Sequence, residues 1–305
     1  MCDHRALVYS SADELLAAAV PFVREGLRAG DRVLAVTTRE NVQALAAALG
    51  ARDRRIDRRH SGDWYAAPGK TLRAYKRYVD EHGRHGRGVT IVGEPVWADR
   101  SPAAVREWAR YEAVINVAFA DTATRLLCPY DARAVPDAII ADAERTHPTL
   151  MSAGASLPSP TFVGPAEFCE RLDREPLERA DGAVSALVVT PDLARVRRFV
   201  ERNAWLSGLR ETRVADLALA VHELATNALR HGGTPVALRI WSAPGEVVAE
   251  VADSGGGLRD PLAGLLEPAP TSAGGRGLWM ARQLCELVEV HSTDAGAVVR
   301  VHMSA

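Results

Sequence analysis

The stretch AVHELATNALRHGG, residues 220–233, sets an acidic and an amide side chain one helical turn apart. Glu223 and Asn227 are four residues apart, so a helix brings their side chains together on one face. Two polar side chains placed together in this way could hold a ligand. On this helix alone, a solvated polar face opposite the apolar residues is the competing interpretation.

Two glycine-containing stretches follow in the chain. In VADSGGG, residues 251–257, an expected strand ends at Asp253, and Gly255 and Gly257 let the backbone approach a ligand closely. GGRGL, residues 274–278, comes directly before an expected helix, where backbone N–H groups and the helix dipole favour phosphate. Ordinary turns and a glycine-rich helix cap are the competing interpretations of these two stretches.

In order and spacing, the three stretches resemble the N box and the two glycine boxes of the Bergerat (GHKL) ATP-binding fold. The resemblance covers residues 183–305, and it is strongest to anti-sigma factor kinases of the RsbW and SpoIIAB type. It implies a two-layer α+β domain that binds ATP and Mg²⁺. It further implies a Ser/Thr protein kinase whose partner is an anti-anti-sigma (STAS) protein or a sigma factor, and it allows a homodimer.

The resemblance assigns roles to the matching residues. Asn227 would hold Mg²⁺, and Glu223 would be the catalytic base or orient the attacking hydroxyl. Asp253 would accept a hydrogen bond from the adenine amine. The other nucleotide contacts would come from Gly255, Gly257, Gly275, Arg276, Gly277 and His231. An exposed loop arginine and an ordinary C-terminal helix residue are the competing interpretations of Arg276 and His231.

One residue departs from the family pattern. The closing hairpin has Gly296 and Ala297 where the family usually has Gly-Thr, whose Thr helps to bind adenine through water. A non-catalytic switch that binds a sigma factor in a nucleotide-dependent manner is therefore an alternative function. A histidine kinase is a weaker alternative, because it needs a phosphoacceptor His on a dimerising helical hairpin. Only His147, next to a Pro, lies near the segment between the domains.

Residues 1–148 alternate short apolar runs with helix-length amphipathic ones, which predicts an α/β domain with a mostly parallel sheet. The pattern resembles the MEDS sensory domain, named from methanogens, methylotrophs and the DcmR regulator. The resemblance implies a RecA-like fold that lacks a working phosphate loop and senses small organic compounds. The stretches that carry it are His4, VGEPVW at 92–97, EWARYEAVIN with Glu112, LLCPYD at 126–131 and THP at 146–148.

A small-molecule site in this domain is expected beyond the carboxyl ends of the strands, as in other open α/β sheets. Glu94, Cys128, Tyr130 and Asp131 are the candidates to line such a sensory pocket. For Cys128, packing in the core is the competing interpretation.

Two other motifs are incomplete. APGKT at 67–71 ends like a Walker A loop, but Trp64 occupies the position of its leading Gly. HEL at 222–224 begins like a zinc-protease motif, but Thr226 stands where the second His is required.

The elements that must position these residues fall into two domains, because 305 residues suffice for two cores. Residues 149–182 are rich in Pro, Ser, Gly and Ala and then in charge, which predicts a linker between domains at 1–148 and 183–305. In the second domain, helices and hairpins predict a largely antiparallel sheet with helices on one face.

Two helix starts are predicted from capping signals. Ser11 and Glu14 form a capping box ahead of the first amphipathic run. In the second domain, Thr190 is the expected N-cap, with Pro191 at the first helical position.

The overall composition disfavours several functional classes. The 37 Lys+Arg residues nearly balance the 39 Asp+Glu residues, so neither a nucleic-acid surface nor a polybasic membrane anchor is indicated. The four cysteines form no Cys-x-x-Cys pair, which argues against a disulfide framework and against a thiolate metal site. No apolar run is long enough to span a membrane, so we expect a cytoplasmic protein.

Overall fold

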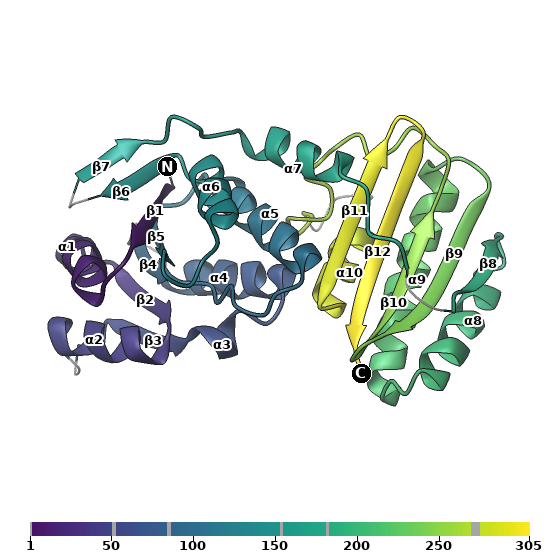
Figure 1. Ribbon diagram of the computed structural model, residues 1–305, viewed down its shortest axis with the longest axis horizontal. Helices are drawn as coiled ribbons and strands as arrows, with labels where there is room; N and C mark the ends of the chain where they lie inside the picture. The colour runs from purple at the N-terminus through teal and green to yellow at the C-terminus, as the bar shows by residue number, and fades with distance from the viewer. Residues whose placement is uncertain (1, 51–52, 84–86, 153–154, 181–182, 270–274) are drawn as a thin grey trace. The chain divides into compact units, whose positions relative to one another are not determined.

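The structure is a computed structural model, and it describes the chain except for residues 1, 51–52, 84–86, 153–154, 181–182 and 270–274. The described residues form two compact units, each with its own sheet (Figure 1). The first unit contains most of residues 1–168, and the second contains residues 169–305.

The first unit is built around a seven-stranded sheet in the order β3-β2-β4-β5-β1-β6-β7. Neighbouring strands are parallel except for β6 and β7, which confirms the predicted α/β class with a mostly parallel sheet. The strands are β1 (Asp3–Tyr9), β2 (Arg32–Thr37), β3 (Ile56–His60), β4 (Val89–Gly93), β5 (Thr124–Asp131), β6 (Thr149–Ser152) and β7 (Ala155–Pro158).

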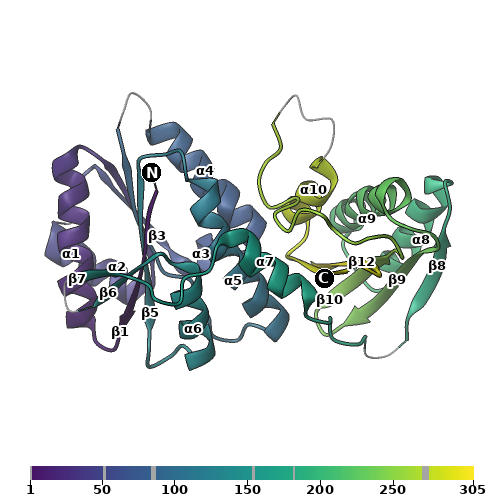
Figure 2. The same ribbon diagram turned by 90° about the horizontal axis from the view of Figure 1, so that it is seen from above.

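Helices cover both faces of this sheet. Helices α1 and α2 lie on one face, and α4, α5 and α6 lie on the other (Figure 2). All residues of β4 are buried, as expected for a parallel strand that is covered on both sides. The helices are α1 (Ala12–Ala29), α2 (Arg39–Leu49), α3 (Ser61–Trp64), α4 (Pro68–His82), α5 (Pro102–Ala118) and α6 (Asp137–Thr146).

Helix α1 begins at the predicted capping signal. The Ser11 side chain accepts a hydrogen bond from the Glu14 backbone N–H at 3.2 Å. The Glu14 carboxylate in turn accepts from the backbone N–H of Ser10 at 2.7 Å, one residue before the position expected for a capping box.

The APGKT stretch forms no phosphate loop. Helix α4 begins at Pro68, so its Gly-Lys-Thr sequence lies in the first helical turn. The Thr71 hydroxyl donates a hydrogen bond to the Trp64 carbonyl at 3.1 Å and is thereby used within the unit.

Part of the predicted linker belongs to the first sheet, which corrects the boundary drawn from the sequence. Strand β6 pairs with β1, and β7 pairs with β6. The Pro- and Ser-rich composition concealed these strands because β7 is an exposed edge strand and needs no apolar alternation. Helix α7 (Pro165–Arg174) follows, and residues 153–154 and 181–182 of the predicted linker lie outside the described residues.

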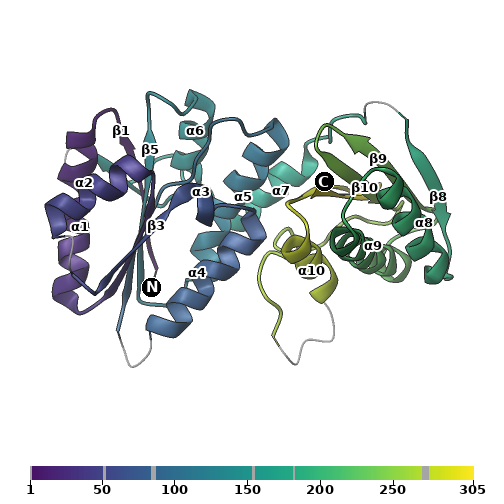
Figure 3. The ribbon, with the colours of Figure 1, turned by 90° about the horizontal axis from the view of Figure 1, so that it is seen from below.

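The second unit has a five-stranded sheet in the order β11-β12-β10-β9-β8, with every neighbouring pair antiparallel. Helices α8, α9 and α10 lie on one face of it (Figure 3). This confirms the predicted α+β layers. The elements are β8 (Ser185–Val189), α8 (Leu193–Leu206), α9 (Glu211–His231), β9 (Val236–Ala243), β10 (Glu246–Ala252), α10 (Arg276–Leu284), β11 (Leu287–Thr293) and β12 (Gly296–Ser304).

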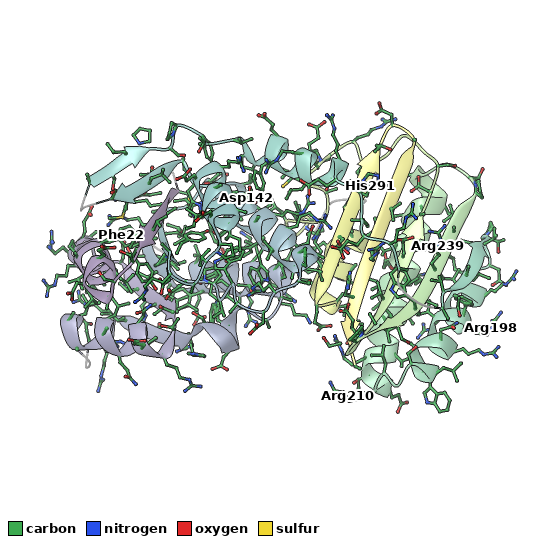
Figure 4. All side chains as sticks on the ribbon, in the orientation of Figure 1. Phe22, Asp142, Arg198, Arg210, Arg239 and His291 are labelled. Carbon is green, nitrogen blue, oxygen red and sulfur yellow. The ribbon has the colours of Figure 1, made fainter. Side chains whose placement is uncertain are left out.

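The core of the second unit lies between its helices and its sheet. It includes Val200 of α8, Leu217 and Val221 of α9, and Val301 of β12. Arg239 and His291 lie on the opposite face of the sheet (Figure 4). Each helix therefore has one face held against the sheet, which determines which side chains can face a ligand.

Helix α8 begins at a different cap from the one predicted. The Asp192 side chain accepts a hydrogen bond from the Arg195 backbone N–H at 3.2 Å, so Asp192 is the N-cap and Thr190 is not. An aspartate carboxylate is a stronger N-cap than a threonine hydroxyl. Because the cap is Asp192, Pro191 precedes the cap instead of following it.

None of the helices in the described part of the chain is both long enough and apolar enough to cross a membrane.

Candidate functional site

A cavity of about 540 Å³ opens in the second unit beside α9 and the start of α10. Its size lies within the roughly 300–1,000 Å³ that is typical of small-molecule sites. The described lining residues are Leu224, Asn227, Ala228, Arg230, His231, Gly232, Val251, Asp253, Gly257, Leu258, Arg259, Ala263, Gly264, Gly275, Leu278, Ala297 and Val299.

Helix α9 brings two of the predicted residues to the cavity. Leu217, Val221 and Leu224 form its buried stripe, and this fixes the rotation of the helix about its axis. Asn227 is half-buried and lines the cavity, and His231 lines it from the exposed last turn. Asn227 is thus not on a purely solvated face.

Glu223 and Asn227 meet Gly277 of helix α10. A Cβ atom at position 277 would lie 2.8 Å from Asn227 Nδ2 and 3.0 Å from Glu223 Oε2. Only a glycine lets α10 approach α9 this closely without displacing the two polar side chains. The structure therefore brings three of the predicted residues together at one contact between helices.

Asp253 directly follows β10 and lines the cavity from the sheet side. Its backbone N–H donates to the carbonyl of Ala297 at 2.9 Å, which holds it in line with β12. Its Oδ1 accepts hydrogen bonds from the backbone N–H groups of Gly255 at 2.8 Å and Gly233 at 3.4 Å. No described residue donates to Oδ2, so this oxygen can accept from a ligand.

Gly255 and Gly257 pack against protein backbone. A Cβ atom at Gly255 would lie 2.6 Å from Gly233 N, and one at Gly257 would lie 2.4 Å from Thr293 O. Gly257 also lines the cavity. These glycines let the loop after Asp253 fold close to its neighbours, which positions the carboxylate.

The N-terminus of α10 faces the same cavity. Gly275 is its N-cap, with a left-handed φ of 85°, and it lines the cavity. The first backbone N–H groups of a helix are available to an anion. Arg276 is exposed and is not among the described lining residues, and Gly274 lies outside the described residues.

Some lining residues were not identified from the sequence. Arg230 and Arg259 bring two cationic side chains to the cavity, and they suit a phosphorylated ligand. Arg230 follows the N box and Arg259 follows the first glycine box, but only the fold shows that both face one cavity. Ala297, at the position where the resembling family has Thr, lies in the wall beside Asp253.

Two of the four candidates for a sensory pocket in the first unit, Glu94 and Asp131, form polar contacts with neighbouring side chains. Glu94 is buried and accepts hydrogen bonds from Tyr9 at 2.5 Å and Asn41 at 3.0 Å. Thr37 also donates to it. Asp131 forms an ion pair with Arg133 at 2.6 Å.

The other two candidates are fully enclosed. The Tyr130 ring stacks on that of Trp97, with centroids 5.9 Å apart. It borders a cavity of only about 10 Å³, which is room for about one water molecule. Cys128 is buried with its Sγ 3.4 Å from Nε2 of His4. That these four residues line a sensory pocket therefore stays a prediction.

Comparison with known families gives two matches. The model of the "MEthanogen/methylotroph, DcmR Sensory domain" (MEDS) matches residues 3–148. The model of the "Histidine kinase-like ATPase domain" matches residues 188–303, the part of the chain that contains the cavity. No curated protein matches the chain.

One of the solved structures that match is the histidine kinase domain of a blue-light activated histidine kinase from Erythrobacter litoralis. It is 18% identical, and the match covers 45% of this chain and 75% of that chain with a TM-score of 0.25.

Proposed function

We propose, from the premise that this chain joins a MEDS domain to a histidine kinase-like ATPase domain, that it is an ATP-dependent signalling switch. In this proposal the second domain binds ATP with Mg²⁺ and phosphorylates a serine or threonine of a STAS protein, or holds a sigma factor. The MEDS domain controls this activity in response to a small molecule.

The observation that carries the proposal is the convergence of Asn227, Asp253 and Gly275 on one cavity, with Glu223 next to Asn227. An amide, a carboxylate with a free acceptor and a helix N-terminus are the groups that a metal ion, an adenine amine and phosphates require. The residues present therefore fit the nucleotide.

Each group has a distinct task in this proposal. Mg²⁺ would neutralise phosphate charge when bound, and the Asn227 amide oxygen would be its protein ligand. Asp253, oriented by two backbone N–H groups, would accept the amine hydrogen bond that distinguishes adenine from guanine. Glu223 would accept the proton of the target hydroxyl or orient that hydroxyl. Arg230 and Arg259 would attract the phosphates.

A nucleotide-dependent switch without phosphotransfer is the second candidate, and Ala297 favours it. A methyl group at this position of the cavity wall cannot hold the water that a threonine hydroxyl would hold for adenine. The smaller number of polar contacts suits a site that binds nucleotide without transferring phosphate.

Autophosphorylation on histidine has less support. His147 is fully buried, and its Nδ1 lies 2.8 Å from the Ala143 carbonyl, so the ring cannot reach a phosphate. Helix α7, in the segment between the domains, has 10 residues and contains no histidine.

Calorimetric titration of the full chain with ATP, with and without Mg²⁺, tests nucleotide binding. We expect Asp253→Asn to weaken binding by about 1.5–3 kcal/mol, because it removes a charged acceptor. Asn227→Ala should abolish the difference between the titrations with and without Mg²⁺. Asp294→Asn, at an exposed turn of the same domain, is the matched control and should bind as the wild type does.

Phosphotransfer is tested separately with labelled ATP and a cognate STAS protein. Transfer that Glu223→Gln abolishes, while ATP binding remains, supports the kinase. Tight binding with no transfer favours the switch, and a wild-type chain that binds no ATP rejects both.

A further inference from the structure

Four potential metal ligands from four separate elements meet inside the first unit. They are His4 of β1, Glu112 of α5, Cys128 of β5 and His147, which directly follows α6. All four are buried, and one ligand atom from each lies within 4.8 Å of all the others. The spacing of the cysteines disfavoured a thiolate metal site, but that argument covers only ligands that are close in the sequence.

The hydrogen bonds of His4 show which of its nitrogens faces the cluster. Asn116 Nδ2 donates to the carbonyls of Ala113 at 3.0 Å and Thr146 at 2.8 Å. Its Oδ1 therefore faces His4 Nδ1 at 3.1 Å and can only accept. His4 carries its proton on Nδ1, and the lone pair of Nε2 points toward Cys128, with 3.4 Å between Sγ and Nε2.

His147 is oriented in the same way by a backbone group. Its Nδ1 lies 2.8 Å from the carbonyl of Ala143, which can only accept. The lone pair of its Nε2 therefore faces the cluster. Both rings are thus held at Nδ1 by an acceptor, which leaves each Nε2 available as a ligand.

The cluster contains acceptors without a donor. Glu112 Oε2 lies 3.6 Å from Nε2 of His4 and 3.6 Å from Nε2 of His147, beyond hydrogen-bond distance. In the described part of the chain, neither Glu112 Oε2 nor His147 Nε2 has a hydrogen-bond partner. Leaving such groups buried and unpaired is unfavourable, so a native fold is expected to satisfy them.

We propose that His4, Glu112, Cys128 and His147 bind one divalent transition-metal ion, and that this ion is zinc. Zinc prefers four ligands drawn from thiolate, imidazole and carboxylate groups. Bond lengths of about 2.0–2.3 Å place tetrahedral ligand atoms about 3.3–3.8 Å apart. The separations of 3.4 and 3.6 Å in the cluster agree with this geometry. Nitrogen and sulfur ligands disfavour Mg²⁺ and Ca²⁺.

The surroundings supply what a zinc site requires. Asn116 and the Ala143 carbonyl hold the outer nitrogens of the two imidazoles, the usual outer contacts of zinc-bound histidines. Glu112 and Cys128 are both buried, where a negative charge without compensation is unfavourable. A divalent ion compensates the two negative charges that these groups carry as ligands.

Four protein ligands leave no open position for a substrate, so the site is structural or regulatory. It connects β1, β5 and α5 to His147, which lies two residues before the first residue of β6. Occupancy would therefore fix the segment from His147 to Thr149.

Metal analysis and cobalt substitution of the full chain test the site. We expect about one zinc ion per chain after purification from zinc-supplemented medium. Co²⁺ added to the metal-free protein should give a thiolate-to-metal charge-transfer band. Cys128→Ser should abolish this band, whereas Cys2→Ser and Cys285→Ser should retain it. Glu112→Gln should weaken zinc binding by more than the roughly 10- to 100-fold that loss of an outer contact costs.

Two further measurements test the zinc site even if a variant of a ligand residue does not fold. In the wild type, a chelator should lower the thermal midpoint of the first unit, and added zinc should restore it. Asn227→Ala should retain the cobalt band, which separates this site from the nucleotide site. Folded wild type that neither contains nor binds Zn²⁺ or Co²⁺ would overturn the proposal, and so would a cobalt band that persists in folded Cys128→Ser.

Discussion

At the scale of single residues, the candidate nucleotide site depends on a few groups held by backbone contacts. The Asp253 carboxylate is oriented by two backbone N–H groups, and the absence of a side chain at Gly277 makes room for Glu223 and Asn227. Ala297 differs in kind, because it offers only a methyl group where the family pattern has a hydroxyl.

Restoring that hydroxyl is a direct test of how adenine is bound. Ala297→Thr should tighten ATP binding by about 0.5–1.5 kcal/mol, since it adds one hydrogen bond through water. Calorimetric titration measures the change, and Ala295→Thr, at the neighbouring exposed turn, is the matched control. Unchanged affinity in a normally folded Ala297→Thr protein would argue that adenine does not contact this wall.

At the scale of elements, the second sheet contains a partly buried charge network on strands β10, β11 and β12. His302 lies 3.0 Å from Glu246 and 2.9 Å from Glu289. Burial alone would lower the pKa of His302, but hydrogen bonds to the two carboxylates and their charges outweigh it and raise the pKa to about 9. Protonated His302 therefore links the three strands.

This raised pKa predicts how stability depends on pH. The contribution of His302 is fully present below its unfolded pKa of 6.5 and is lost as pH rises through about 9. His302→Gln should remove stabilisation on the order of 3 kcal/mol near pH 6 and little above pH 9. Thermal unfolding of both proteins across this range measures it, and parallel pH profiles would contradict the assignment.

At the scale of the whole molecule, the chain combines two units with separate cores. One contains the proposed zinc cluster and the other contains the cavity proposed to bind nucleotide. Separate cores commonly unfold in separate steps, because each unit has its own cooperative set of contacts.

We therefore expect two thermal transitions that respond to different ligands. MgATP at about 100 times its dissociation constant should stabilise the unit that binds it by about 2.7 kcal/mol. Scanning calorimetry should show this as a shift of one transition to higher temperature. At the same MgATP concentration, Asp253→Asn should lose about half to nearly all of this shift, while the chelator should act on the other transition. A single transition that responds to both ligands would indicate that the two units unfold together.

By itself, the sequence determined the two-domain organisation, both fold classes and the three stretches that border the nucleotide cavity. These features are local, since apolar periodicity and short glycine motifs depend only on residues that are close together in the sequence. Strands β6 and β7 were missed because each has only four residues, too few to show a period, and the edge strand β7 is exposed throughout.

Only the tertiary structure decided which distant residues meet. It placed Cys128 with His4, Glu112 and His147. These four ligands come from β1, α5, β5 and the end of α6, so their proximity follows from strand order and helix packing. The spacing of residues along the chain predicts neither the strand order nor the helix packing. The physical reason is that contacts between elements form only when the elements pack together around a common hydrophobic core.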